Sequence, residues 1–252
     1  MACIGIDIGS TATKGVLWNG RSFSFYITPT GWTPNESAKK AVAKIQKRGR
    51  IMQNDGLFIT ATGYGRNVFQ ADKRVTEITC HAAGAHYLLP EATTVLDIGG
   101  QDSKVISLGP DGKVTDFLMN DKCAAGTGRF LQNMAVHLGY TLSDFCCITE
   151  SAAAHPINNM CAVFAESEVI GLISQGVSKE AICLGLLDSV AQRAVNLLSR
   201  LSEHGDICFS GGCAQNELLR KLIEKKTKRR VVTPDRAQFV GAIGAALIGA
   251  GL

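Results

Sequence analysis

Apolar and polar residues alternate in short runs, separated by glycine-containing turns, near the start of the chain. Alternation with a period of two is typical of β-strands. The dipeptide Asn19-Gly20, between the second run and the third, is a strong hairpin signal. The pattern therefore predicts a β-meander and a further strand after it. The predicted strands are Cys3–Ile8, Lys14–Trp18, Ser22–Ile27 and Leu57–Thr60.

Apolar residues spaced three or four positions apart predict helices elsewhere in the chain. After Pro34, for example, Ala38, Val42 and Ile45 share one helical face, and lysines occupy the opposite face. Residues 141–156 show no regular pattern. The other predicted helices are Glu77–Leu88, Gly128–Leu138, Ala162–Ser174, Glu180–Leu201, Asn216–Lys226 and Gln238–Ile248, and two late strands are predicted at Asp206–Phe209 and Arg230–Val232.

The pattern of the first strands starts again near residue 94. Strands are predicted at Val95–Ile98, Ser103–Leu108 and Val114–Met119. Both copies contain the frame D-I-G-x-x-x-x-K, which begins at Asp7 and again at Asp97. Two buried strands followed by glycine turns can match by coincidence, but here the order of three strands repeats as well. The repeat predicts a duplicated α/β fold.

No low-complexity linker divides the chain. The repeat places the boundary between two domains after residue 92, so we expect domains at residues 1–92 and 93–252. The final helix is in position to pack back on the first domain. The two halves are expected to share one interdomain cleft.

Composition is that of a folded globular protein. Hydrophobic residues make up 46% of the 252 residues and charged residues 19%, which disfavours disorder. The net charge of +4 is mild, and apart from a run at residues 224–230 the basic residues are scattered, so nucleic acid is not an expected partner. The N-terminus lacks an export signal and no stretch approaches transmembrane length, which predicts a cytoplasmic protein without a membrane partner.

The chain has nine cysteines, and in the cytoplasm they are not expected to form disulfides, because cellular thiols keep them reduced. Most are expected to be small buried side chains, with one or two available as metal ligands. Cys123 and Cys161 differ from the other cysteines because each lies just before a predicted helix. A thiolate there lies in the positive field of a helix N-terminus. The alternative, that both are plain buried thiols, stays open on these grounds.

Three glycine turns follow predicted strands, at Gly9-Ser10-Thr11, Gly99-Gly100-Gln101 and Gly211-Gly212. Glycine lets backbone amides approach a phosphate closely. The carboxylates of Asp7 and Asp97, at the ends of strands, are suited to hold Mg²⁺, mostly through water. Each turn alone is weak evidence, but together with the duplicated frame they predict an ATP-binding cleft.

The motifs DIGSTATK, LDIGGQDSK and FSGGCAQN resemble the two phosphate motifs and the adenosine motif of the actin, sugar-kinase and Hsp70 superfamily. More narrowly, NDKCAAGTGRFL and MCAVFAESEVI, with ATGYGR and CHAAGA, resemble the activators (component A) of 2-hydroxyacyl-CoA dehydratases, which are iron–sulfur ATPases of the BadF/BadG/BcrA/BcrD type. The likeness covers essentially the whole chain. It implies duplicated actin-like, ribonuclease H-like domains with a nucleotide cleft between them.

The resemblance also implies roles for individual residues. Asp7, Asp97 and Gln101 are the candidate catalytic residues, and Asp7 and Asp97 the candidate Mg²⁺ ligands. Thr127 is expected to report phosphate occupancy to the cluster cysteines. The roles of Cys213, Glu166 and Glu168 stay open. The residues expected to bind ATP or ADP are Ser10, Thr11, Ala12, Thr13, Lys14, Gln101, Asp102, Thr127, Gly211, Gly212 and Gln215.

A [4Fe–4S] cluster takes about four thiolates, and no C-x-x-C spacing occurs in this chain. Two ligands per chain imply either a different metal site or a cluster shared across a two-fold axis. The resemblance implies the second: Cys123 and Cys161 of each of two subunits ligate one bridging [4Fe–4S] cluster. The holoprotein is then an obligate homodimer.

By the same resemblance, the expected function is ATP-dependent electron transfer. A ferredoxin or flavodoxin loads the cluster, and the activator passes the electron at low potential to a partner dehydratase or reductase. Two alternatives on the same fold are a small-molecule kinase and an ATP-binding regulatory protein without metal. The short chain leaves little room for the acceptor pocket that a kinase needs.

Overall fold

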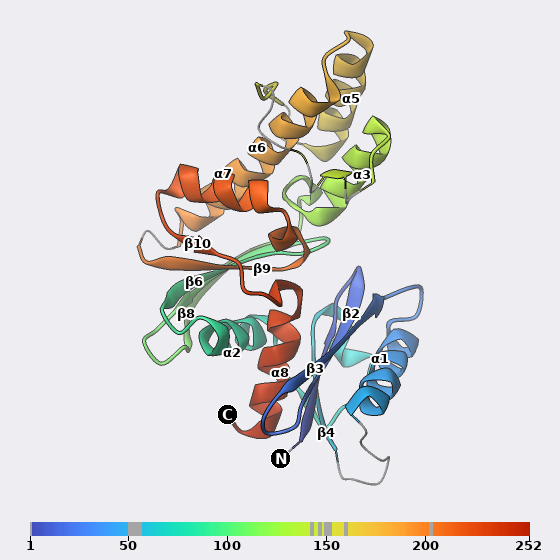
Figure 1. Ribbon diagram of the computed structural model, residues 1–252, viewed down its shortest axis with the longest axis vertical. Coiled ribbons are helices and arrows are strands. Elements are labelled where there is room, and N and C mark those ends of the chain that lie inside the picture. The colour runs from blue at the N-terminus through green and yellow to red at the C-terminus, as the bar shows by residue number, and fades with distance from the viewer. Residues whose placement is uncertain are drawn as a thin grey trace. The chain divides into compact units, whose positions relative to one another are not determined.

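The computed structural model describes residues 2–49, 57–141, 144–145, 148, 153–158, 161–201 and 204–252. The chain forms two compact units (Figure 1). The first consists of Met1–Val95, Ile106–Asp116 and Pro234–Leu252, and the second of Leu96–Val105 and Phe117–Thr233. The last nineteen positions, which hold the final helix, therefore belong to the same unit as the first strands.

The first five-stranded sheet has the order β3-β2-β1-β4-β5. Strand β1 pairs antiparallel with β2 and parallel with β4. In this register Asp7 of β1 lies opposite Lys14 on one side and Thr62 on the other. The strands are β1 (Cys3–Ile8), β2 (Ala12–Trp18), β3 (Phe23–Pro29), β4 (Phe58–Thr62) and β5 (Lys73–Arg74).

Helices cover both faces of this sheet: α1 (Pro34–Gly49) on one face and α8 (Val240–Ala250) on the other (Figure 1). Strand β1 is buried along its whole length, because its residues alternate between the two helix layers. Ile6 and Ile8 pack against the α1 side, while Gly5 faces the backbone of α8 so closely that a side chain has no room. Helix α2 (Glu77–Leu88) packs against α8.

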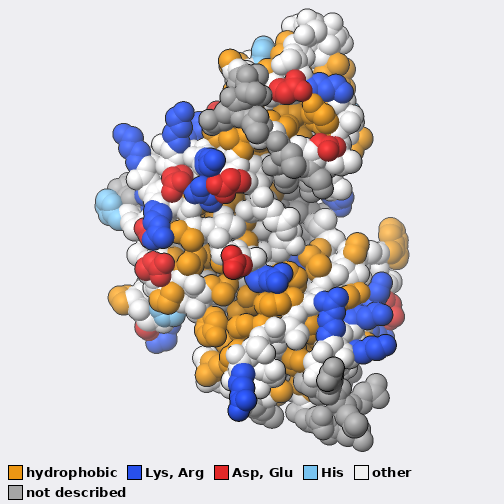
Figure 2. Space-filling view, in the orientation of Figure 1, with side chains coloured by type: hydrophobic (Ala, Val, Ile, Leu, Met, Phe, Trp, Pro, Cys, Tyr) orange, Lys and Arg blue, Asp and Glu red, His pale blue; other side chains and the backbone are white. Residues whose placement is uncertain are grey.

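Figure 2 shows hydrophobic side chains gathered over α8 and its surroundings. The first unit contains an aromatic cluster in which Trp18 contacts Phe23 and Tyr87, and Phe25 contacts Phe239. These rings close the core cluster formed by Val16 and the inner face of α8.

The second five-stranded sheet has the order β10-β9-β6-β7-β8. Read in the opposite direction, this is the order of the first sheet, with β6 to β10 in the places of β1 to β5. Its strands are β6 (Ala92–Ile98), β7 (Ser103–Leu108), β8 (Val114–Asn120), β9 (Asp206–Ser210) and β10 (Val231–Val232). Its helices are α3 (Gly128–Leu138), α5 (Ala162–Ser174), α6 (Lys179–Leu198) and α7 (Glu217–Thr227). The predicted α/β fold with duplicated sheets is confirmed.

Most predicted elements match the structure within a few residues. The pattern missed β5, which is two residues long, and α6 ends at Leu198 rather than Leu201. The predicted irregular stretch 141–156 and the pair Cys146-Cys147 fall largely or wholly outside the described residues. The expectation that no stretch approaches transmembrane length is wrong for α6, which is long and apolar enough by composition. However, 56% of its apolar window is buried inside the fold, as in the core helix of a soluble protein.

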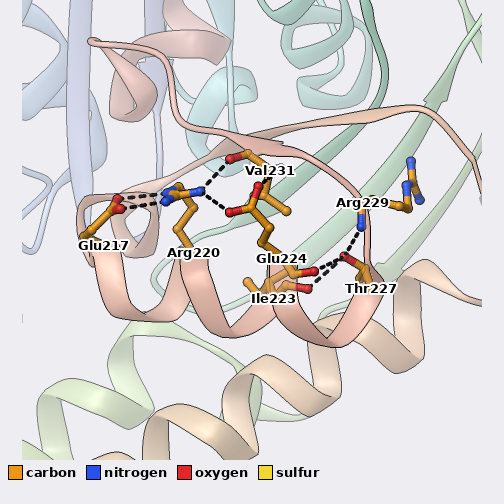
Figure 3. A network of polar contacts seen from close by, with 7 residues as sticks. All are labelled: Glu217, Arg220, Ile223, Glu224, Thr227, Arg229 and Val231. Carbon is orange, nitrogen blue, oxygen red and sulfur yellow. Dashed lines mark hydrogen bonds and ion pairs between the residues drawn. The ribbon is translucent and has the colours of Figure 1, made fainter. Parts of the chain in front are cut away.

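Helix α7 and the basic run at residues 224–230, which begins inside this helix, are tied to neighbouring groups (Figure 3). Arg220 binds both oxygens of Glu217, one oxygen of Glu224 and the carbonyl of Val231 in β10. Further along, the Arg229 guanidinium donates to the carbonyls of His204 and Gly205, each at 2.8 Å. These contacts fix the end of α7 against the strand that follows it.

Candidate functional site

The first unit brings Lys14 and Asp7 together at the end of β1. Lys14 Nζ lies 2.9 Å from Asp7 Oδ2, and the two side chains are 20% and 9% exposed. The pairing follows from the local sequence, because a tight turn joins β1 to β2 and sets these residues opposite each other. The Lys14 ammonium therefore lies beside the Asp7 carboxylate, next to the turn that contains Gly9.

Thr30 forms two hydrogen bonds with the turn between β1 and β2. The Thr30 hydroxyl donates to the Gly9 carbonyl at 2.6 Å, and its amide donates to the Thr11 carbonyl at 3.0 Å. Thr13 is fully buried, and its hydroxyl lies 3.0 Å from that of Thr30. Of the predicted phosphate-binding residues here, Thr11 is exposed and Ser10, Ala12 and Lys14 are half-buried, whereas the Thr13 hydroxyl is engaged within the fold.

The second unit repeats the arrangement with deeper burial. Lys104 Nζ lies 2.7 Å from Asp102 Oδ2 and 3.4 Å from Asp97 Oδ2, and the lysine side chain is 2% exposed. The Ser210 hydroxyl donates to Asp97 Oδ1 at 2.9 Å. Asp97 is therefore held by two side chains from neighbouring strands, and Gln101 extends from the same turn as an exposed side chain.

The sequence prediction marked Gly211 but missed that Gly63 is its counterpart in the first unit. Gly63 follows β4 with φ +87°, and Gly211 follows β9 with φ +89°. A Cβ at either position collides with a backbone carbonyl and with the carboxylate of Asp7 or Asp97, respectively. The signal in the sequence was Thr62-Gly63 and Ser210-Gly211, each directly after an apolar strand, but the local pattern does not show that both glycines cover an aspartate.

Helix α3 begins on the second glycine turn. The amide of Gly128 donates to the Gly99 carbonyl and that of Arg129 to the Gly100 carbonyl, each at 2.9 Å. The preceding Thr127 is fully buried, and its hydroxyl donates to the Ala124 carbonyl at 2.6 Å. The turn and the start of α3 are thus one hydrogen-bonded unit.

Of the predicted adenosine residues, Gly212 and Gln215 lie in the 3₁₀ turn Gly212–Gln215 after β9, and Gly211 directly precedes this turn. Gly212 and Gln215 are exposed, and the space around Gly212 is open. Cys213 is buried between them, and its Sγ lies close to Gly128, so a side chain on that glycine would contact it. Cys213 is a packing residue between this turn and α3.

Cys123 and Cys161 occupy corresponding positions at the starts of helical segments. Cys123 precedes the 3₁₀ turn Ala124–Gly126. Its backbone amide donates a hydrogen bond to Oδ1 of Asn120 at 3.3 Å. Cys161 directly precedes the thirteen-residue helix α5. Cys123 is half-buried and Cys161 is exposed.

The other described cysteines have a different environment. Cys3, Cys80, Cys183, Cys208 and Cys213 are all buried. Burial raises the pKa of the Cys3 thiol to about 11 and those of Cys80 and Cys183 to about 12, which disfavours the thiolate that binds iron. Within the described ranges no three His, Cys, Asp or Glu side chains are grouped to hold a metal ion. Among the described cysteines, the accessible thiols are those of Cys123 and Cys161.

Comparison with known proteins decides the family. The model of the BadF/BadG/BcrA/BcrD ATPase family matches residues 4–249. The chain belongs to this family. Among its relatives, the protein YjiL of Escherichia coli, which is uncharacterized, is 46% identical over 98% of this chain and 96% of its own length.

Two solved structures of relatives share the whole fold. The activator of 2-hydroxyisocaproyl-CoA dehydratase from Clostridium difficile, with bound ADPNP, has a TM-score of 0.92 and 38% identity, covering 99% of this chain and 94% of that one. Component A of (R)-2-hydroxyglutaryl-CoA dehydratase from Acidaminococcus fermentans has a TM-score of 0.94 and 40% identity, covering 98% and 97%. The fold of this BadF/BadG/BcrA/BcrD ATPase is the fold of dehydratase activators, one of which binds an ATP analogue.

Proposed function

We propose that this ATPase uses ATP binding and hydrolysis to deliver a low-potential electron to a partner dehydratase or related reductase. The electron comes from a [4Fe–4S] cluster shared by two copies of the chain. Support comes from the relatives that activate 2-hydroxyacyl-CoA dehydratases at about 40% identity over nearly the full length. A cytoplasmic ferredoxin or flavodoxin is the proposed electron donor.

The accessibility of the cysteines carries the cluster assignment. Cys123 and Cys161 are the two thiols open to solvent among the seven described cysteines. A [4Fe–4S] cluster needs about four thiolates, and two per chain fit it when a two-fold axis supplies the other pair. When bound, the cluster supplies the electron; the chain holds it and sets its surroundings.

The surface beside Cys161 supports a second copy as the neighbour. Helix α5 exposes Val163 and Phe164 at 68% and 63%, together with Ile170 and Ile173. Only Ala165, Val169 and Leu172 of this helix are buried. Large apolar side chains gathered on one exposed helix are typical of an interface. A dimer that joins two copies around Cys123 and Cys161 covers them.

The nucleotide is assigned to the glycine turns that end β1 and β6. Lys14 carries positive charge beside this turn, where backbone amides can approach a phosphate. Asp7 and Asp97 hold Mg²⁺ through water, and the exposed Gln101 side chain orients the attacking water. Gly211, Gly212 and Gln215 border the adenosine.

Anaerobic purification with iron and sulfide analysis tests the proposal. We expect about four irons per dimer in the native chain. Cys123→Ser and Cys161→Ser each abolish iron binding and leave ADPNP affinity unchanged, whereas Cys183→Ala, which alters a buried thiol of α6, retains the iron. A native protein that stays free of iron after reconstitution contradicts the cluster and favours an ATP-binding regulatory protein.

A further inference from the structure

Helix α5, which begins at Cys161, is held to the rest of its unit by few contacts. Its buried surface is a narrow stripe of Ala165, Val169 and Leu172. Two half-buried carboxylates, Glu166 and Glu168, lie between Ala165 and Val169 in the sequence. The two carboxylates add polar contacts to this apolar stripe.

Glu168 ties the segment before Cys161 to the helix after it. Its Oε1 accepts hydrogen bonds from the backbone amide of Asn158 at 2.9 Å and from the Asn158 side chain at 3.2 Å. The Cys161 carbonyl in turn accepts the amide of Ala165 at 2.9 Å. The Cys161 carbonyl is therefore bonded into the first turn of α5, and Asn158 is bound to the same helix.

Glu166 ties α5 to α3. Its Oε1 lies 2.8 Å from Nε2 of His137, in the last turn of α3. The contact forms with a neutral or a charged imidazole, provided that Nε2 carries the proton. Figure 1 shows the two helices next to each other, consistent with their contacts. Each of them follows one of the two accessible cysteines.

The other end of α3 rests on the glycine turn after β6. Gly128 and Arg129 donate to the carbonyls of Gly99 and Gly100, each at 2.9 Å. An eleven-residue helix is a rigid rod about 16 Å long. Displacing the turn therefore displaces His137, and through Glu166 it displaces α5.

We propose that His137 and Glu166 are positioning residues that transmit the nucleotide state of the Gly99–Gln101 turn to Cys161. Glu168 completes the path by fixing Cys161 to α5. The assignment rests on the proposed function in one respect, namely that a nucleotide phosphate binds at this turn. It gives Glu166 a role in coupling rather than in hydrolysis.

The reactivity of Cys161 in the iron-free protein measures this coupling directly. Iodoacetamide labels the thiol, and mass spectrometry of the peptide gives its rate with and without ADPNP and Mg²⁺. In the native chain we expect ADPNP to change the rate at Cys161 by about fivefold or more. In Glu166→Ala and in His137→Ala, the ADPNP-dependent change falls below about twofold, while ADPNP affinity stays as in the native chain.

Two variants separate coupling from general loosening of α5. His137→Gln keeps a donor for Glu166 and restores the nucleotide-dependent rate. Ser167→Ala alters an exposed residue of α5 whose hydroxyl contacts only its own helix, and it leaves the change intact. The double variant H137A/E166A loses no more coupling than either single variant, because both act through one contact.

The proposal is overturned if Glu166→Ala binds ADPNP normally and keeps the full change at Cys161. It is also overturned if ADPNP binds the native chain without changing that rate. Failure of the proposed function looks different. An iron-free native protein whose Cys161 still responds to ADPNP removes the cluster but leaves the coupling path in place.

Discussion

The hydroxyl of Ser210 donates a 2.9 Å hydrogen bond to Oδ1 of Asp97, although 113 residues separate them in the chain. Both side chains are buried. Ser210→Ala removes this hydrogen bond to a buried carboxylate, and we expect a loss of about 1–3 kcal/mol in the free energy of unfolding. Urea titration measures it. Ser174→Ala, at an exposed position of α5, is the control, and equal effects of the two variants contradict the assigned bond.

The two glycines that cover the aspartates give the second prediction. Gly63→Ala and Gly211→Ala each place a Cβ against a carboxylate at a positive φ. We expect each to lower the free energy of unfolding by at least about 2 kcal/mol and to weaken ADPNP binding. Gly171→Ala, in a helical position with open space around it, is expected to stabilise the protein instead, by about 0.5–1 kcal/mol.

The duplicated lysines are expected to differ in their effect on stability. Lys104 is 2% exposed and contacts two carboxylates, whereas Lys14 is 20% exposed and contacts one. Lys104→Met removes the buried charge that compensates Asp97 and Asp102 and is expected to cost about 3–5 kcal/mol, while Lys14→Met, at a position more open to water, is expected to cost less. Thermal unfolding distinguishes them. If Lys14→Met is the more destabilising change, the burial difference between the halves is not what governs these pairs.

The sequence predicts a contact in the site when the two residues are close together in the chain, and misses it when they are far apart. Asp7 and Lys14 lie in adjacent strands joined by a tight turn, so the repeated frame sufficed to mark them. Asp97 and Ser210 meet only because β9 lies beside β6, and His137 meets Glu166 only through helix packing. No local periodicity encodes such contacts. Strand β5 was missed for a related reason, since two residues are too few to show an alternation.

The cysteines differ in their expected reactivity. Burial raises the pKa values of Cys3, Cys80 and Cys183 to about 11 or 12, so these thiols stay protonated at neutral pH. Cys123 and Cys161 are open to solvent. In the iron-free native protein near neutral pH, about 7–8, iodoacetamide is expected to label these two before the five buried cysteines that the structure describes. Early labelling of Cys80 by mass spectrometry runs against this order, and labelling in denaturant removes the difference.

The network around Arg220 makes stability depend on pH. The backbone amide of Val231, followed by Arg220, lowers the pKa of Glu224, and Arg220 lowers that of Glu217. Because the folded-state pKa values are depressed, the stabilisation is present above the unfolded value of about 4.3 and is lost as the pH falls through the folded values. The side chains of Glu217 and Glu224 are 59% and 37% exposed, respectively, so solvent screening limits the effect to about 1 kcal/mol or less. Glu224→Gln is therefore expected to lower the free energy of unfolding more at pH about 7 than at pH about 3. Urea titrations at the two pH values check this, and a deficit that persists undiminished at the lower pH shows that lost packing, rather than lost charge, is responsible.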